Sequence, residues 1–277
     1  MKFIELFKVF FCSNTKLKNF KEFFVPISYL KNWWLFYLDC FDLLGEGNKI
    51  YKLRNGINLN SDIKQKDGFI INEIWGANDY TPIDFEIAEN DTVVEIGGYK
   101  GYFTVFASKK AKKGKIYTFE PTKYNFNFLR KNLLVNKCNN VKSFQLGLAG
   151  KKTIKKFFVG LDGQSGNSII SDWFDEKRKP TTFTVSCISI NNIFSLCKIK
   201  DIDFLKVDCE GAEYEIFFNT SGKDLQRIKK ISMEFHQIGE LKIKDLKKFL
   251  EKNNFSVKLI DSDKPIGMLY AKRKEKV

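Results

Sequence analysis

The feature that most constrains the fold is an alternation of short apolar stretches with amphipathic ones, which begins at residue 92. Short apolar stretches predict β-strands, and apolar residues at helical spacing predict helices. The predicted strands are 92–96, 115–119, 141–146, 202–207 and 228–235, and the predicted helices are 102–111, 122–136, 212–218 and 242–252. Strands that alternate with helices form a mostly parallel sheet with helices on both faces. The chain is therefore predicted to be an α/β protein.

The C-terminal part of the chain departs from this alternation. Residues 255–260 and 267–272 are both predicted strands, and only residues 261–266 separate them. A parallel pair needs a longer crossover connection, so these two strands are predicted to form an antiparallel hairpin.

Residues 150–187 also interrupt the alternation. Two predicted strands, 153–159 and 181–187, flank residues 160–167, which are rich in glycine and polar residues. Long loops beyond the carboxyl ends of strands often build the substrate side of a site in α/β proteins, so residues 160–167 are one candidate for substrate selection. The other interpretation is a surface hairpin.

The chain before residue 48 differs in pattern, and a domain boundary is predicted there. Residues 1–47 are rich in aromatic residues and predict an N-terminal helical cap or extension, whereas residues 48–277 form the predicted main domain. Apolar residues and lysines near the start fit a helix that packs on the main domain, an oligomer contact, or a basic helix on a membrane surface. Glu5 lies in the same stretch, weakens a purely basic face and favours packing.

The main domain begins with a predicted β-hairpin. Residues 50–54 and 57–59 flank Asn55-Gly56. This dipeptide predicts a type I′ turn because Asn and Gly accept positive φ angles. Residues 69–75 then predict a short helix.

Composition argues against several functional classes. The single histidine has no Gly-x-Ser-x-Gly motif beside it, and the six cysteines include no Cys-x-x-Cys pair, so a serine hydrolase, a disulfide framework and a zinc site are all disfavoured. Reduced thiols in the cytoplasm are expected.

The net charge of +14 suits nucleic acid, but the lysines are spread along the chain and base-reading motifs are absent. No signal-peptide cleavage site and no stretch long enough to span a bilayer are found.

The strongest motif is a glycine-containing turn after the strand at 92–96. Gly97, Gly98 and Gly101 surround Tyr99 between this strand and the following helix. Glycine lets the backbone approach a ligand, and the helix N-terminus offers free N–H groups. The spacing differs from the Gly-x-Gly-x-x-Gly of dinucleotide binders, and Glu95 would repel a pyrophosphate. An acidic residue at this place suits a ligand with an ammonium group.

The next strand ends in Phe119-Glu120-Pro121. A carboxylate at the tip of this strand accepts hydrogen bonds from both hydroxyls of a ribose. Glu95 and Glu120 together therefore predict a nucleoside that has an amino-acid-like end and no phosphates. S-adenosylmethionine meets this description.

The sequence resembles the FkbM-type methyltransferases over about residues 48–240. The matching blocks are Glu95-Ile-Gly-Gly-Tyr-Lys-Gly-Tyr-Phe, Phe119-Glu120-Pro121 with Tyr124, Asn132 and Asn136, and Leu205-Lys-Val-Asp-Cys-Glu-Gly-Ala-Glu213. The resemblance implies a Rossmann-like class I fold and S-adenosylmethionine as cofactor. It implies these cofactor-binding residues: Glu95, Gly97, Gly98, Tyr99, Gly101, Glu120 and Pro121. Glu95 and the bulky Tyr99 stand where the family commonly has Asp and Asn. Glu95 keeps the acidic character, and Tyr99 is the departure that bears on the fit of the cofactor's methionine end.

The third block supplies the candidate catalytic residues. Asp208 and Glu210 follow an apolar strand at the carboxyl edge of the sheet, where open α/β folds bind ligands. A hydroxyl acceptor benefits from a general base within hydrogen-bonding reach, so Asp208 is predicted as base or orienting group and Glu210 is the second choice. His236, near the end of the next strand, is the third candidate. Glu213 is interpreted as a carboxylate in the first turn of a helix.

A metal site is a separate hypothesis. Asp208, Glu234 and His236 would be the ligands of a divalent cation that acidifies the acceptor hydroxyl. No fixed ligand spacing supports this site, so the sequence alone predicts no metal.

The sequence therefore predicts an S-adenosylmethionine-dependent O-methyltransferase. The resemblance implies a hydroxyl of a sugar, glycan or secondary metabolite as acceptor, and the cytoplasm is the expected location. The oligomeric state stays open. One alternative is an RNA methyltransferase, which the positive charge favours. The other is a non-catalytic nucleoside-binding or scaffold protein in which Tyr99 blocks the cofactor.

Overall fold

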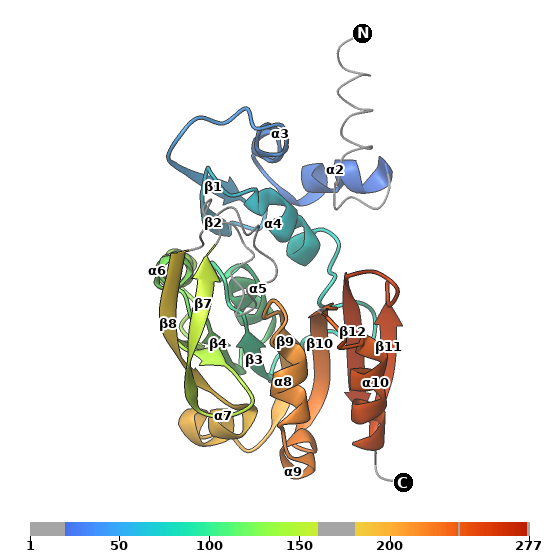
Figure 1. Cartoon of the computed structure of the whole chain (residues 1–277). Helices are drawn as coiled ribbons and strands as arrows, with labels where there is room; N and C mark the ends of the chain where they lie inside the picture. Colours follow the sequence, from blue (N-terminus) through green and yellow to red (C-terminus); the bar gives the residue numbers. More distant parts are fainter. Residues whose placement is uncertain (1–19, 160–180, 238, 276–277) are drawn as a thin grey trace. The chain divides into compact units, whose positions relative to one another are not determined.

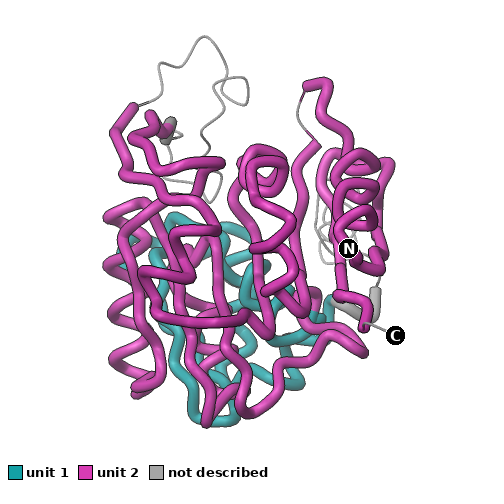
Figure 2. Tube along the Cα trace, turned by 90° about the horizontal axis from the view of Figure 1, so that it is seen from below, with its two compact units in different colours: residues 1–78 teal, residues 79–277 magenta. Residues whose placement is uncertain are grey.

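The computed structural model describes residues 20–159, 181–237 and 239–275 (Figure 1). The chain divides into two compact units, residues 1–78 and 79–277 (Figure 2). The first unit contains the described part of the predicted cap together with the predicted hairpin and the helix after it. The limits of the main domain, predicted as 48–277, stay a prediction.

The first unit combines short helices with one β-hairpin. Its elements are α2 (Phe20–Tyr29), α3 (Trp34–Cys40), β1 (Asn48–Lys52), β2 (Asn58–Asp62) and α4 (Asp67–Trp75). The helical character of the cap is confirmed by α2 and α3, while the predicted first helix lies outside the described residues. Buried Asp39 accepts hydrogen bonds from Lys49 and Tyr51, which ties α3 to β1.

The predicted hairpin is confirmed, but the predicted turn type is wrong. Strands β1 and β2 pair antiparallel, with Lys52 opposite Asn58. Gly56 has a φ of +87°, whereas Asn55 does not lie in the left-handed region. The backbone N–H of Gly56 donates to the carbonyl of Leu53. The connection is therefore a three-residue loop that ends in a left-handed glycine, and only one residue needs positive φ.

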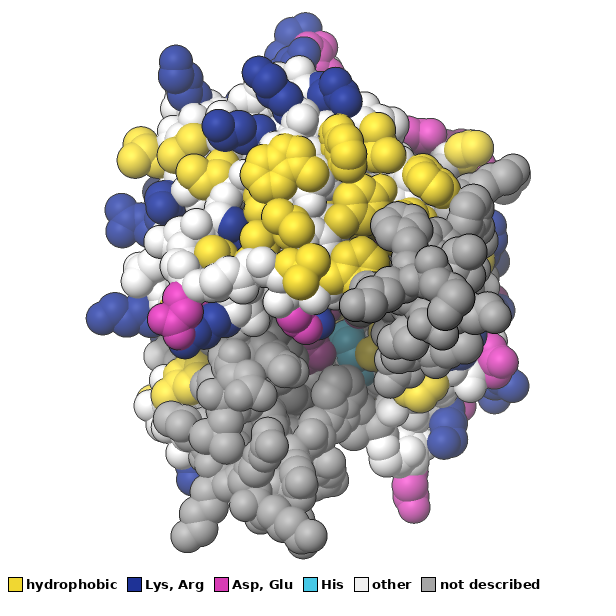
Figure 3. Space-filling view, turned by 90° about the horizontal axis from the view of Figure 1, so that it is seen from above, with side chains coloured by type: hydrophobic (Ala, Val, Ile, Leu, Met, Phe, Trp, Pro, Cys, Tyr) yellow, Lys and Arg dark blue, Asp and Glu magenta, His cyan; other side chains and the backbone are white. Residues whose placement is uncertain are grey.

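Large apolar side chains remain exposed on the first unit. Those at least one-third exposed are Phe24, Ile27, Trp33, Trp34, Leu43 and Ile50. Seen from above, one face of the molecule carries a group of hydrophobic side chains with lysines and arginines around it (Figure 3). No helix in the described ranges is both long and apolar enough to cross a membrane.

The second unit is built on a seven-stranded sheet of order β11-β12-β10-β9-β3-β4-β5. The strands are β3 (Thr92–Ile96), β4 (Lys115–Phe119), β5 (Val141–Phe144), β9 (Ile202–Val207), β10 (Ile228–His236), β11 (Phe255–Ile260) and β12 (Ile266–Arg273). Neighbours from β10 to β5 are parallel, and β12 is antiparallel to both β10 and β11. The mostly parallel sheet and the C-terminal antiparallel hairpin are both confirmed.

Helices cover both faces of this sheet (Figure 1). The helices are α5 (Tyr102–Lys110), α6 (Lys123–Val135), α7 (Ile190–Cys197), α8 (Glu213–Phe218), α9 (Gly222–Leu225) and α10 (Ile243–Lys252). Apolar residues of α7, α8 and α10 share one buried cluster with the central strands, while α5 contacts α6 and β4. Strand order reverses between β3 and β9, and ligands of open α/β sheets bind at such a point.

The segment after β5 forms a small sheet of its own. Strand β8 (Thr181–Ile188) pairs with β6 (Gly147–Leu148) and, antiparallel, with β7 (Thr153–Val159). The two strands predicted here are confirmed, and residues 160–167, the candidate for substrate selection, lie outside the described residues. Helix α7 was not predicted, although Ser189 and its third successor Asn192 form a capping box at its start.

Candidate active site

The register of the sheet aligns four neighbouring parallel strands near their carboxyl ends. The residues that pair across these ends are Ile96, Phe119, Val207 and Met233. The residues that follow them in the chain are Gly97, Glu120, Asp208 and Glu234. Gly97 and Glu120 are predicted to bind the cofactor, Asp208 is a predicted catalytic residue, and Glu234 is a ligand in the metal hypothesis. Their common position at the carboxyl edge therefore follows from strand pairing alone.

The glycine turn packs directly against the loop after β9. Gly97 has a φ of +83°, and a Cβ added to it would overlap the carbonyl oxygen of Asp208. Gly101, the N-cap of α5, has a φ of +82°. A Cβ added to Gly101 would lie only 3.1 Å from Cα of Leu129. Both positions therefore need glycine, for the backbone angle and for the close approach.

Glu95 lies inside the protein rather than on its edge. Its side chain is 1% exposed, and its Oε2 accepts hydrogen bonds from the hydroxyls of Thr104 (2.5 Å) and Thr118 (2.9 Å). The ammonium of Lys206 lies 4.0 Å from its Oε1. Burial raises the pKa of Glu95 to about 7, although Lys206 and the two threonines favour the charged form.

Glu120 holds the glycine turn in place. One carboxylate oxygen accepts the backbone N–H of Tyr99 at 2.8 Å, and the other accepts the N–H and hydroxyl of Thr122 at 2.8 and 2.5 Å. Tyr99 has a φ of +46°, so this bond fixes a residue in a conformation that non-glycine residues seldom adopt. Burial raises the pKa of Glu120 to about 7. Pro121 follows, partly buried.

Asp208 is held from two sides. The hydroxyl of Tyr80 lies 2.9 Å from Asp208 Oδ2 and 3.2 Å from Glu234 Oε2, so its single proton is shared between two carboxylates. Lys206 Nζ donates to the carbonyl of Gly97 at 2.9 Å and to Asp208 Oδ2 at 3.2 Å. Burial alone would raise the pKa of Asp208, but Lys206 and then His236 lower it.

His236, the last residue of β10, completes the cluster around Asp208. Its imidazole is 1% exposed, with Nδ1 3.1 Å from Glu213 Oε1. Its Nε2 lies 3.4 Å from Glu210 Oε2 and 3.6 Å from Glu234 Oε1. Burial by itself lowers the pKa of His236, but the hydrogen bond to Glu213 and the surrounding carboxylates raise it to about 10. Burial raises the pKa of Glu210 to about 8.

The structure thus brings the three predicted catalytic residues, Asp208, Glu210 and His236, into one cluster. Glu213 begins α8, as predicted for a first-turn carboxylate, and it also orients His236. Sequence reasoning assigned no role to Tyr80 or Lys206. A charged residue within the apolar strand 202–207 was the available signal for Lys206, whereas the sequence offers no comparable signal for Tyr80.

This arrangement can bind and orient a polar group at the switch point of the sheet. A carboxylate fixed by a lysine and a tyrosine can accept a hydrogen bond from a substrate hydroxyl. The glycine turn lies beside it, so a ligand on the turn and a second ligand at Asp208 would be neighbours. Two adjacent ligands are what a group-transfer reaction requires.

Comparisons with known proteins find several methyltransferases to which this chain is similar. Methyltransferase sdnD of Sordaria araneosa is 25% identical over 193 residues, which cover 60% of this chain and 73% of that protein. Among solved structures, M. jannaschii TYW2 in complex with AdoMet has 15% identity and a TM-score of 0.43, with 83% of this chain and 89% of that chain covered. A putative rRNA-methylase from Clostridium thermocellum has 12% identity and a TM-score of 0.45, with 73% and 96% covered.

The family model described as the methyltransferase FkbM domain matches residues 95–257, which is more than half of the chain. The match contains the glycine turn, Glu120 and the cluster around Asp208. The chain therefore belongs to the FkbM family of S-adenosylmethionine-dependent methyltransferases.

Proposed function

We propose that this enzyme methylates a hydroxyl group of a small molecule, such as a sugar, a glycan or a secondary metabolite. The observation that carries the proposal is the contact between Gly97 and Asp208. Lys206 donates both to the carbonyl of Gly97 and to Oδ2 of Asp208, so the Asp208 carboxylate lies next to the turn where the cofactor would bind, in a cluster that includes Glu210 and His236.

The cofactor side of the proposed site is the glycine turn and the end of β4. Its residues are Glu95, Gly97, Gly98, Tyr99, Gly101, Glu120 and Pro121. Glu120 would accept hydrogen bonds from the ribose hydroxyls, in addition to the backbone N–H of Tyr99 that it already accepts. Glu95 is buried at the end of β3, with Thr104 and Thr118 on its carboxylate, and would act on the positive end of the cofactor without direct contact.

The acceptor side of the proposed site is the cluster around Asp208. The acceptor hydroxyl donates a hydrogen bond to Asp208 or Glu210 and loses its proton to that carboxylate. Its oxygen forms a bond to the methyl carbon while the carbon–sulfur bond breaks, and neutral S-adenosylhomocysteine leaves. S-adenosylmethionine supplies the leaving group, so the protein has to align the acceptor and take the proton.

The test uses the full chain and S-adenosylmethionine that carries a tritiated methyl group. Isothermal titration first establishes cofactor binding, and a panel of sugars, glycans and hydroxylated metabolites is then tested for label transfer. A methyl ether survives mild alkali, whereas a methyl ester is hydrolysed, so alkali-stable label excludes a carboxyl acceptor, and the use of acceptors without nitrogen excludes N-methylation. Label that transfers only to carboxyl or nitrogen acceptors would contradict the proposed acceptor.

An RNA acceptor is the second candidate, because the net charge of +14 favours a polyanion. Label transferred to total RNA, with an affinity that falls steeply as salt is raised, would support it. RNA binding that disappears in modest salt and gives no methylated product would leave the small-molecule acceptor as the better hypothesis.

A further inference from the structure

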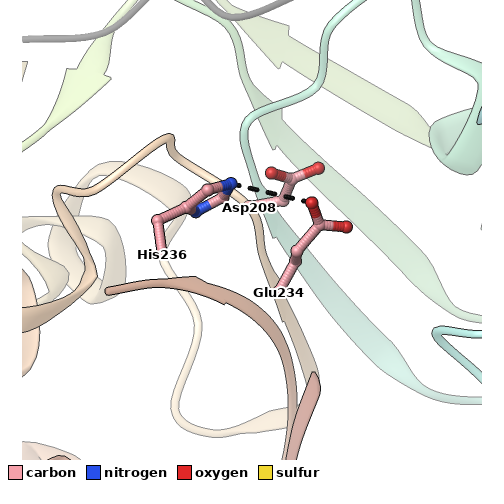
Figure 4. Close-up of side chains that lie close together, drawn as sticks. All are labelled: Asp208, Glu234 and His236. Atoms are coloured by element: carbon pink, nitrogen blue, oxygen red, sulfur yellow. Dashed lines mark ion pairs between the residues drawn. The ribbon is translucent and has the colours of Figure 1, made fainter. Parts of the chain in front are cut away.

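We propose that Asp208, Glu234 and His236 form a binding site for a divalent metal cation. Each residue offers one ligand atom, and the three atoms all lie within 4.8 Å of one another. Their side chains point toward a common region at the carboxyl edge of the sheet (Figure 4). Ligand atoms on opposite sides of a bound cation stand about 4–5 Å apart, so small side-chain adjustments would complete the site.

The backbone explains why these three residues meet. Met233 pairs with Val207, so the next residues of the two parallel strands, Glu234 and Asp208, are neighbours. Side chains alternate along a strand, which puts His236 on the same face as Glu234. Glu234 and His236 therefore come from the last residues of β10, and Asp208 is the first residue after the adjacent strand β9.

Tyr80 and Lys206 hold one oxygen of the Asp208 carboxylate, and Tyr80 also holds one oxygen of the Glu234 carboxylate. Tyr80 contacts Oδ2 of Asp208 and Oε2 of Glu234, and Lys206 contacts the same Oδ2. The other oxygen of Glu234, Oε1, is the one that lies 3.6 Å from Nε2 of His236. One oxygen of each carboxylate is thus held by Tyr80, and Oε1 of Glu234 faces the imidazole of His236.

A buried glutamate orients the histidine in the way metal-binding histidines require. Glu213 is 0% exposed, and its Oε1 contacts Nδ1 of His236, so Nε2 faces the cluster. A carboxylate on the far nitrogen of a ligating histidine fixes its tautomer and raises its basicity. Glu213 Oε1 also accepts the backbone N–H groups of Cys209 and Gly211, which fix the carboxylate in place. Its Oε2 is buried without a hydrogen-bond partner among the described residues.

Acidic side chains outnumber basic ones around the three ligands. Five carboxylates gather here, and Lys206 and His236 contact them: Glu95, Asp208, Glu210, Glu213 and Glu234. Two carboxylate oxygens and one imidazole nitrogen suit Mn²⁺ or Zn²⁺. A cation at this place would make a bound hydroxyl more acidic, a consequence that rests on the proposed function. The binding itself does not depend on it.

The test is a titration of the metal-free, full chain with Mn²⁺ in the absence of S-adenosylmethionine. Calorimetry and the paramagnetic resonance signal of free Mn²⁺ both measure binding without any reading of activity. We expect one saturable Mn²⁺ per chain. Glu234→Gln and Asp208→Asn preserve side-chain size and remove one anionic ligand each, so each should weaken binding at least about tenfold. Glu251→Gln, an exposed change on α10 with the same loss of charge, should leave the affinity unchanged.

The proposal is overturned if the folded chain shows no saturable binding up to millimolar Mn²⁺. It is also overturned if Glu234→Gln and Asp208→Asn bind Mn²⁺ as tightly as the parent, because the ion would then sit elsewhere. Circular dichroism confirms that each variant is folded before titration. Since no cofactor is added, a failure of cofactor binding or of hydroxyl methylation leaves this result intact, and methyl transfer without Mn²⁺ binding would overturn the metal site alone.

Discussion

Gly97 and Asp208 are held against each other by the pairing of β3 with β9. The backbone N–H of Asp208 donates to the carbonyl of Ile96 at 3.0 Å, and a Cβ on Gly97 would overlap the carbonyl oxygen of Asp208. This contact joins the turn proposed for the cofactor to the loop proposed for catalysis. A side chain at position 97 would have to push the two apart.

Gly97→Ala should therefore be strongly destabilising. A positive φ alone costs an alanine about 1–2 kcal/mol, and the overlap with Asp208 adds to this. We expect the free energy of unfolding to fall by more than about 3 kcal/mol, with weakened cofactor binding in whatever protein remains folded. Gly239→Ala is the matched control, because Gly239 has a φ of +57° and no atom within 4 Å of its Cβ position. Equal losses in urea unfolding of the two variants would show that close approach is not what position 97 requires.

Glu120→Ala should weaken the binding of S-adenosylmethionine. The substitution removes the proposed ribose acceptor and also frees the backbone N–H of Tyr99. Loss of a charged hydrogen-bond partner costs about 1.5–3 kcal/mol, which corresponds to roughly a 10–150-fold rise in Kd by isothermal titration. Glu251→Ala on α10 serves as the control with the same change of charge. An unchanged Kd for the Glu120 variant would remove this residue from the cofactor site.

Glu95→Gln should flatten the dependence of stability on pH. The pKa of Glu95 is raised from its ordinary value of 4.5 to about 7, so the folded protein keeps a proton that the unfolded chain releases between these values. The stability from this group is complete below pH 4.5 and is lost as the pH rises to about 7. Between pH 5 and 8, the variant should lose roughly 1–3 kcal/mol less than the parent in urea unfolding. Parallel curves for the two proteins would contradict the raised pKa.

The central strands could be predicted closely because burial on both faces gives them continuous apolar stretches. The bounds of β3, β4 and β9 match their predictions. The turn at Asn55-Gly56 was assigned the wrong type, since a dipeptide preference does not determine the length of the loop around it. Helix α7 follows an insertion where the alternation is interrupted, and its capping residues were passed over.

The site was predictable where it depends on strand ends. Asp208 and Glu234 are level because each follows a pair of residues at the same register of two parallel strands, and His236 lies two residues further along β10. Tyr80 lies in an irregular segment before β3 and reaches Asp208 only through the tertiary fold. Its part in the cluster therefore could not be inferred from residue spacing.

The substitution Tyr80→Phe tests whether the Tyr80 hydroxyl contributes to catalysis at Asp208. It removes one hydroxyl shared between Asp208 and Glu234 and keeps the ring that packs 5.6 Å from Phe103. Loss of one such hydrogen bond costs about 1–2 kcal/mol, so kcat should fall by roughly 5–30-fold while the Kd for S-adenosylmethionine stays within about twofold. Tyr117→Phe on β4 is the control, because it makes the same chemical change within another part of the sheet. A fall in cofactor affinity as large as the fall in kcat would place Tyr80 on the cofactor side instead.

Asp208→Asn should have a larger effect on turnover than Tyr80→Phe. The change preserves size and hydrogen bonding, but an amide cannot take the proton of the acceptor hydroxyl. If Asp208 is the general base, kcat falls by about 10²–10⁴-fold and the Kd for S-adenosylmethionine is spared, since the lost interaction matters chiefly in the transition state. Single-turnover methyl transfer at saturating cofactor measures the chemical step directly.

A much smaller fall in Asp208→Asn would mean that Asp208 only orients the acceptor. Glu210 would then be the residue to examine, because its Oε2 lies 3.4 Å from Nε2 of His236 in the same cluster. Glu210→Gln should in that case show the large loss that Asp208→Asn lacks. If Asp208→Asn instead weakened cofactor binding while the chemical step at saturating cofactor stayed normal, Asp208 would belong to the cofactor side of the contact with Gly97. The base would then have to come from another part of the chain.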